Sequence, residues 1–226
     1  MHFFQQKKIL IAGGFLCLAF ACIHLGWVFL YTPIEINQGI AQKIMYVHVP
    51  SILTAYFFIG ILFFSSLGYL LKNKEGYDLV AQAAAEIAVL NLFLALITGS
   101  LWGKPTWNTY WTWDARLTLT LIMFLLFCGY LTYRKLGQYS LKTRQGSGLI
   151  AILGFFSIPL NHLAVKWFRS IHQPSTLFAS SPKIDAELYY PLVFSIVFFL
   201  VFFLYFFWLR FLLEQKKRSY LSKIFT

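Results

Sequence analysis

The chain has 226 residues, of which 59% are hydrophobic and only 12% are charged. Soluble domains carry about 25% charged residues, so this composition excludes a soluble globular protein and indicates a polytopic membrane protein. The formal net charge of +11 would suggest nucleic-acid binding in a soluble domain. Here the basic residues fall in short segments between apolar runs, where we expect them to set the membrane topology.

Six apolar runs are long enough to cross a hydrocarbon layer of ~30 Å as helices that rise 1.5 Å per residue. They cover residues 9–31, 49–71, 83–101, 117–133, 149–165 and 188–213. The first run exceeds the usual 7–15-residue core of a cleaved signal, and no A-x-A-like site follows it, so we expect it to be a helix. Without a linker or repeat, the sequence predicts one all-α membrane domain over residues 1–226.

The basic residues predict which side of the membrane each connection faces. Of the 19 Lys and Arg residues, 13 lie at the termini and in the connections on their side, and six lie in the other three connections. Cytoplasmic segments carry the excess of Lys and Arg, so we expect both termini in the cytoplasm of a bacterium with an inner membrane. Residues 32–48, 102–116 and 166–187 would then face the periplasm.

The three cysteines, Cys17, Cys22 and Cys128, all lie inside apolar runs. The chain has no C-x-x-C or C-x-x-C-H motif, so the sequence predicts neither a dithiol redox centre nor covalent haem attachment. We interpret the three residues as small, buried hydrophobic side chains.

One predicted periplasmic connection is unusually rich in tryptophan. The stretch LWGKPTWNTYWTWDARL at 101–117, called here the WWD loop, holds Trp102, Trp107, Trp111 and Trp113, four of the seven tryptophans. An aromatic belt that anchors helices at the headgroup level is one interpretation, but a belt spreads its rings over several helix ends. The concentration in one loop favours a flat, largely apolar ligand that lies against indole faces.

The WWD loop also carries signals for its own backbone. Gly103 and Pro105 predict a turn after the third helix. A helix over residues 106–113 would place four side chains on one face and lie flat on the membrane as an amphipathic segment; these are Trp107, Tyr110, Trp111 and Asp114. Asp114 is also well placed to cap the fourth helix, because its carboxylate can accept hydrogen bonds from the free N–H groups that follow it.

Two of the five histidines, His48 and His172, lie in different predicted periplasmic connections. His48 precedes Pro50, which is tolerated in a first helical turn, so its ring should stand at the mouth of the second helix. Each histidine alone is more simply an interfacial residue. As a pair beside an aromatic platform they are candidates for the two axial ligands of a haem iron.

These segments carry a family resemblance. The string WGKPTWNTYWTWDARLT resembles the WWD signature of haem-handling proteins, and six helices, MYVHVPS and SIHQP extend the resemblance to the CcmC family of cytochrome c biogenesis. The resemblance implies that haem b is held non-covalently and transiently between His48 and His172 on the periplasmic face. It also implies delivery to the haem chaperone CcmE, with the ABC transporter subunits CcmA and CcmB and the small protein CcmD as partners. Asn108 and Tyr110 stand where the family commonly has glycine and tryptophan.

The expected activity is binding and hand-over, so we do not expect an enzyme. The rings expected to shield haem are Trp102, Trp107, Tyr110, Trp111 and Trp113. Arg116, and less directly Lys104, would meet the propionates, while Asp114 would cap its helix and pair with Arg116 or with a chaperone residue. The alternatives are a transporter that moves haem or a small solute through its own bundle, a structural assembly subunit without a chromophore, and a haem ligase.

Glu86 bears on the transporter alternative, because it is the one carboxylate close to the membrane interior. An unpaired carboxylate at a helix centre costs roughly 3 kcal/mol on insertion scales. We therefore expect Glu86 at the membrane boundary or in a polar contact rather than on a transport path.

Overall fold

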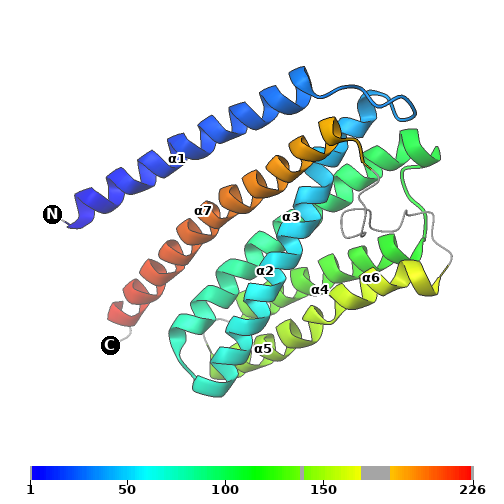
Figure 1. Ribbon diagram of the computed structural model, residues 1–226. Helices are drawn as coiled ribbons and strands as arrows, with labels where there is room; N and C mark the ends of the chain where they lie inside the picture. The colour runs from blue at the N-terminus through cyan, green and yellow to red at the C-terminus, as the bar shows by residue number, and fades with distance from the viewer. Residues whose placement is uncertain (1, 138–139, 169–183, 225–226) are drawn as a thin grey trace.

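The computed structural model describes residues 2–137, 140–168 and 184–224, which are almost entirely helical (Figure 1). Six helical segments in this part of the chain are long and apolar enough to cross a membrane, as predicted. The elements in chain order are α1 (His2–Gly26), the π-helical turn η1 (Trp27–Tyr31), the 3-10 turn η2 (Ile40–Ile44), α2 (Met45–Lys72), α3 (Glu75–Trp107), α4 (Ala115–Gly137), α5 (Leu141–Phe155), α6 (Ser157–Trp167) and α7 (Ala186–Ile224).

Both termini lie at one end of the bundle (Figure 1). We call this the terminal end, and we call the opposite end, which carries residues 32–39 and 108–114, the aromatic end. The core lies between these ends, where α2 and α3 pack against α4, α5 and α7. Four α3 alanines in this core allow close helix approach, as small residues do inside membranes: Ala81, Ala84, Ala85 and Ala88.

Helix α1 stands partly apart from the rest of the bundle (Figure 1). His24 is the buried residue among its described side chains. The His24 Nε2 atom lies 2.9 Å from the Ser195 hydroxyl of α7, and its ring stacks on Phe198 with centroids 4.7 Å apart. Much of the apolar surface of α1 is therefore left uncovered by the described part of this chain.

The fifth predicted span is broken into two helices, α5 and α6, at Phe156. Pro159, three residues into α6, has no N–H to donate to the Phe155 carbonyl, so the helical ladder cannot run through this point. The apolar run alone had predicted one continuous helix.

The interpretation of the cysteines as buried side chains is wrong. Cys22 is exposed, and Cys17 and Cys128 are only partly buried. In a membrane-spanning chain an apolar run can equally face lipid, so position within such a run does not predict burial inside the bundle.

A buried ionic cluster joins four helices near the terminal end. Asp78 of α3 is 1% exposed, and its carboxylate accepts two hydrogen bonds from the Arg134 guanidinium of α4, at 2.6 and 3.0 Å. Arg218 of α7 lies 2.7 Å from the same carboxylate, and Arg144 of α5 lies 3.8 Å from it. One carboxylate thus holds together the ends of helices that are distant in sequence.

Glu86 makes the polar contact expected of it. Its carboxylate accepts hydrogen bonds from the Arg210 guanidinium of α7, one of them at 2.7 Å. This pair connects α3 to α7 on the terminal half of both helices. Because its charge is neutralised there, Glu86 gives no support to a transport path.

Candidate functional site

The WWD loop follows a different backbone path from the predicted one. Helix α3 continues through Gly103 and Pro105 and ends at Trp107, so the predicted turn and the amphipathic helix over 106–113 are both wrong. Asn108 ends the helix in the left-handed conformation, with φ 59°. Glycine and asparagine are the residues that adopt this conformation most readily, which explains why either can occupy this position. Pro105 is tolerated because it removes a single hydrogen bond in the last helical turns.

Two contacts hold the loop in this path. The Lys104 ammonium donates to the Asn108 carbonyl at 3.1 Å and so satisfies the end of α3. The Ser100 hydroxyl donates to the Tyr110 carbonyl at 2.7 Å, which folds residues 109–114 back along α3. A Cβ atom at Gly103 would lie 3.1 Å from the Thr109 carbonyl oxygen, so this close return of the chain favours glycine there.

The rings of the loop differ in exposure. Trp111 and Trp113 pack edge to face with centroids 5.7 Å apart, and the Trp113 side chain is 76% exposed. Tyr110 is also exposed, with the Lys104 ammonium 5.6 Å from its ring centroid. Trp107 is half-buried. The aromatic end thus presents apolar ring surface that the described part of the chain does not cover.

Asp114 caps α4, as predicted. Its carboxylate accepts a hydrogen bond from the Arg116 N–H at 2.9 Å, and its carbonyl accepts from the Thr118 N–H at 2.9 Å. Such a cap satisfies a backbone donor that has no partner inside the helix. The further pairing of Asp114 with the Arg116 side chain or with a chaperone stays a prediction.

Trp102 joins the WWD loop to the other described segment of the aromatic end. Its indole Nε1 donates to the Gln38 side-chain oxygen at 2.8 Å. Gln38 is held in turn by Glu35, whose carboxylate accepts from the backbone N–H groups of Gln38 at 2.6 Å and Asn37 at 3.0 Å. The position of the Trp102 ring therefore depends on a turn more than 60 residues earlier in the chain.

The stability of the turn at Glu35 should depend on pH. The two backbone N–H groups lower the pKa of the Glu35 carboxyl below its usual 4.5. A depressed pKa means that the ionised carboxylate stabilises the turn at neutral pH and that this stabilisation is lost as the pH falls through the folded-state value. We expect Glu35→Gln to speed hydrogen exchange at Asn37 and Gln38 at pH 7, with the difference from wild type shrinking as the pH falls through the lowered pKa of the Glu35 carboxyl. Equal exchange at pH 7, with α3 peptides as the internal control, would contradict this.

His48 lies in the first turn of α2, inside the helix and not in the connection before it as predicted, and its ring contacts α3. Its Nδ1 atom is 3.0 Å from the Ala95 carbonyl oxygen and 3.3 Å from the Thr98 hydroxyl oxygen. The Thr98 hydroxyl donates its own proton to the Leu94 carbonyl at 2.6 Å, so both partners of Nδ1 are acceptors. Nδ1 is therefore assigned the proton, and Nε2 carries a lone pair, which is the form of imidazole that binds a metal.

The His48 ring packs against α3 at Gly99. A Cβ atom at Gly99 would lie 2.8 Å from the ring Cε1 atom, so the ring occupies space that any larger residue would fill. The Trp102 ring meets the imidazole edge to face, with centroids 5.8 Å apart. Within the described residues, Nε2 makes no hydrogen bond.

Arg116 supplies positive charge beside this histidine. Its guanidinium is close enough to act electrostatically on both His48 and Tyr56, although the side chain is half-buried. In the part of the chain that the structure describes, the guanidinium meets no carboxylate and donates no hydrogen bond. A half-buried cation without a counter-charge is costly, and an anionic group on a ligand would relieve that cost.

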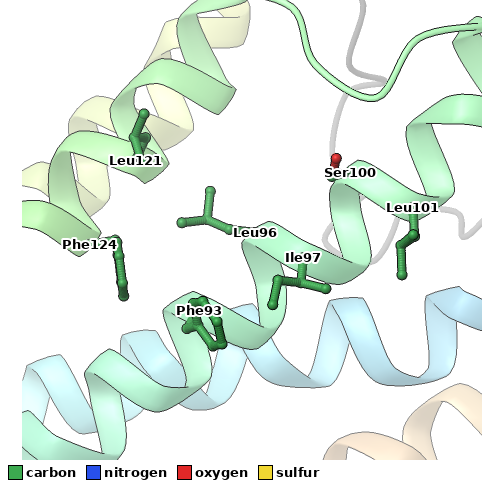
Figure 2. A pocket seen from close by; sticks show the side chains of 7 residues that line it. All are labelled: Phe93, Leu96, Ile97, Ser100, Leu101, Leu121 and Phe124. Atoms are coloured by element: carbon green, nitrogen blue, oxygen red, sulfur yellow. The ribbon is translucent and has the colours of Figure 1, made fainter.

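An apolar groove of about 370 Å³ lies between α3 and α4 (Figure 2). Its lining residues are Phe93, Leu96, Ile97, Ser100, Leu101, Leu121 and Phe124. On a helix with 3.6 residues per turn, the α3 members of this set point away from Ala95, Thr98 and Gly99, which contact His48. The groove is thus separate from the histidine site.

The structure brings together some of the predicted site residues. His48 and Trp102 are in ring contact near the start of α2, the Arg116 charge acts on His48 from the first turn of α4, and Tyr110 and Trp113 are exposed on the loop. His172, the predicted second ligand, lies outside the described residues.

Sequence reasoning missed the residues that support the site. Gln38, Thr98 and Gly99 act on Trp102 or His48 from other elements, and their contacts have no local signal. The one available signal was Gly99, a glycine inside an apolar helical run about one turn before Trp102. Glycine at such a position often marks a close approach of another side chain or backbone to the helix.

These features define a class of protein, a six-span α-helical membrane protein that gathers a histidine, an arginine without a carboxylate partner among the described residues, and an aromatic loop at the end opposite its termini. The family model of heme exporter protein C (CcmC) matches residues 2–224, and the chain belongs to this family. The resemblance noted in the sequence is confirmed.

Individual relatives agree with the family match. Heme exporter protein C of Bradyrhizobium diazoefficiens is 36% identical over 162 residues, which cover 71% of this chain and 62% of that protein. The protein of the same name from Rhodobacter capsulatus is 34% identical over 75% of this chain and 71% of its own length. That of Escherichia coli K12 is 32% identical over 89% of this chain and 84% of its own length.

Proposed function

We propose that this protein binds haem at its aromatic end and passes it on during the maturation of c-type cytochromes. The name that its relatives carry, heme exporter protein C, supports a role in haem handling. The observation that carries the proposal is that, among the described residues, the His48 Nε2 atom makes no hydrogen bond and the half-buried Arg116 guanidinium meets no carboxylate.

Haem carries two groups that these side chains could bind, its iron and its propionates. Its iron takes imidazole nitrogen as an axial ligand, and its propionates are carboxylates of the kind that arginine binds well. His48 would supply one axial ligand through Nε2, oriented by the hydrogen bond from Nδ1 to the Ala95 carbonyl. We propose His172 as the second ligand. Lys104 is a weaker candidate for a propionate, because Asn108 already holds its ammonium.

The aromatic rings would keep the bound haem accessible to a partner. Trp102 adjoins the His48 ring, and the exposed rings of Tyr110 and Trp113 would cover the porphyrin with Trp107 and Trp111. We propose non-covalent haem b, delivery to the chaperone CcmE, and assembly with CcmA, CcmB and CcmD. In this proposal the protein does no bond chemistry and lies in a bacterial inner membrane, with both termini in the cytoplasm and the aromatic end in the periplasm.

Haem titration of the protein purified in mild detergent tests the proposal. The wild type should give a Soret band with low-spin bis-histidine features. His48→Ala should lose the low-spin species because an axial ligand is gone. Arg116→Gln should keep the spectrum but weaken affinity by about tenfold or more, since a hydrogen bond to a charged group contributes roughly 1.5–3 kcal/mol.

His162 offers a matched control, because it is an exposed histidine of α6 that the proposal does not use. His162→Ala should bind haem like the wild type. A wild-type protein that gives no Soret band of bound haem on titration would favour the structural-subunit alternative. An unchanged low-spin spectrum in His48→Ala would show that the iron ligand is another residue.

A further inference from the structure

One buried side chain next to Arg116 has no role in the site described above. Asn161 of α6 is 1% exposed and lies within the membrane-spanning part of the bundle. Its Nδ2 donates to the Arg116 carbonyl at 3.1 Å and to the Thr120 hydroxyl oxygen at 2.8 Å. Its Oδ1 accepts from the Tyr56 hydroxyl at 3.2 Å. A single amide therefore joins α2, α4 and α6.

The chemistry of the partners determines the orientation of this amide. The Arg116 carbonyl can only accept, and the Thr120 hydroxyl donates its own proton to that carbonyl at 2.8 Å. Both partners on this side therefore need the NH₂ group of Asn161, which leaves Oδ1 for Tyr56. Both amide protons and the amide oxygen are used. Removing the side chain would leave the Tyr56 hydroxyl without its acceptor, away from water, which is costly in a membrane.

These bonds hold Arg116 by its backbone on both sides. Its N–H donates to Asp114, and its carbonyl accepts from Thr120 and Asn161. Tyr56, the third partner of Asn161, stands about two turns along α2 from His48. The amide thus connects the first turn of α4, which carries the cation, to the helix that carries the imidazole.

We infer that Asn161 is a positioning residue, which sets the Arg116 guanidinium where it can reach a carboxylate of the ligand bound at His48. The inference rests on the proposed function. If the Asn161 hydrogen bonds only stabilised the fold, their loss would weaken the binding of any porphyrin equally. A positioning role would weaken recognition of the carboxylates in particular.

Comparison of haem with haem dimethyl ester, whose propionates are uncharged, separates these roles. We would measure the dissociation constants of both compounds for the full chain in detergent. The wild type should prefer haem by about tenfold or more, as expected for a charge-assisted contact. Asn161→Ala should reduce this preference to about twofold or less, because the guanidinium loses its set position.

Asn91 provides the matched control, because it is a fully buried asparagine of α3 whose Nδ2 donates within its own helix to Ile87. Asn91→Ala should keep the wild-type preference even if it lowers stability. Tyr56→Phe removes only the bond to Oδ1 and should shift the preference in the same direction as Asn161→Ala, by less. This second variant decides the question if Asn161→Ala does not fold.

The outcomes separate the inference from the proposed function. A wild type that binds haem and its ester equally would remove the role proposed for Arg116. A wild type that prefers haem, with Asn161→Ala and Tyr56→Phe keeping the full preference, would overturn the positioning role alone. Equal loss of affinity for both compounds in these variants would also overturn it, because only a structural tie would then remain.

Discussion

Replacement of Asp78 by asparagine is expected to lower the thermal unfolding midpoint of the purified protein by about 10 °C. The Asp78 carboxylate is 1% exposed and lies within ion-pair distance of Arg134, Arg144 and Arg218. Loss of one partner from a buried pair costs roughly 3–5 kcal/mol, because the remaining charge stays buried without compensation. In a chain of this size, each kcal/mol shifts the midpoint by about 2–4 °C. Thermal unfolding in mild detergent measures the effect.

Glu75 gives a control within the same cluster. Its side chain is 55% exposed, and it lies 3.4 Å from Arg218 and 3.8 Å from Arg144. Exposed ion pairs contribute about 0–1 kcal/mol, so Glu75→Gln should shift the midpoint by at most a few degrees. Equal shifts for the two variants would show that burial does not govern the strength of this cluster.

Replacement of Gly99 by alanine is expected to abolish low-spin haem binding without unfolding the protein. The new methyl group would lie 2.8 Å from the His48 Cε1 atom, so the ring must leave its seat and its bond to Ala95. Alanine also favours helix over glycine by about 1 kcal/mol, so stability should be little changed. A haem titration with a parallel thermal melt measures both quantities.

Gly60 of α2 is the matched position, because outside the adjacent helix backbone and its chain neighbours no atom lies within 4 Å of a Cβ placed there. Gly60→Ala should keep the haem spectrum of the wild type. If Gly99→Ala retained wild-type affinity and a low-spin Soret band, the position of the His48 ring on α3 would not matter for binding. The opposite pattern, loss in Gly60→Ala alone, would also contradict the proposed site.

Features that depend on a few neighbouring residues were predicted correctly. Asp114 caps α4 because a cap needs only a carboxylate two residues before a free N–H. The six spans were predicted because a long apolar run is costly outside lipid or a core. The end of α3 was predicted wrongly, since Gly103 and Pro105 are local signals for a turn, but Lys104 and Asn108 complete the helix beyond them.

The residues that support the site could not be predicted, because their partners are distant in the sequence. The Nδ1 partner of His48 is 47 residues away, the Trp102 partner is 64 residues away, and Tyr56 is 105 residues from Asn161. Tertiary packing brings these atoms within hydrogen-bonding distance, and hydrophobic patterns do not encode which polar groups will meet.

By itself the amino-acid sequence determined that this protein has six helices long and apolar enough to cross a membrane, and where its tryptophans gather. Apolar length and terminal capping are properties of continuous segments, so they can be read without a fold. Only the tertiary structure decided which nitrogen of His48 has no hydrogen-bond partner among the described residues, and that the Arg116 guanidinium meets no carboxylate among them. Both depend on atoms of separate helices, whose relative positions arise when α2, α3, α4 and α6 pack together.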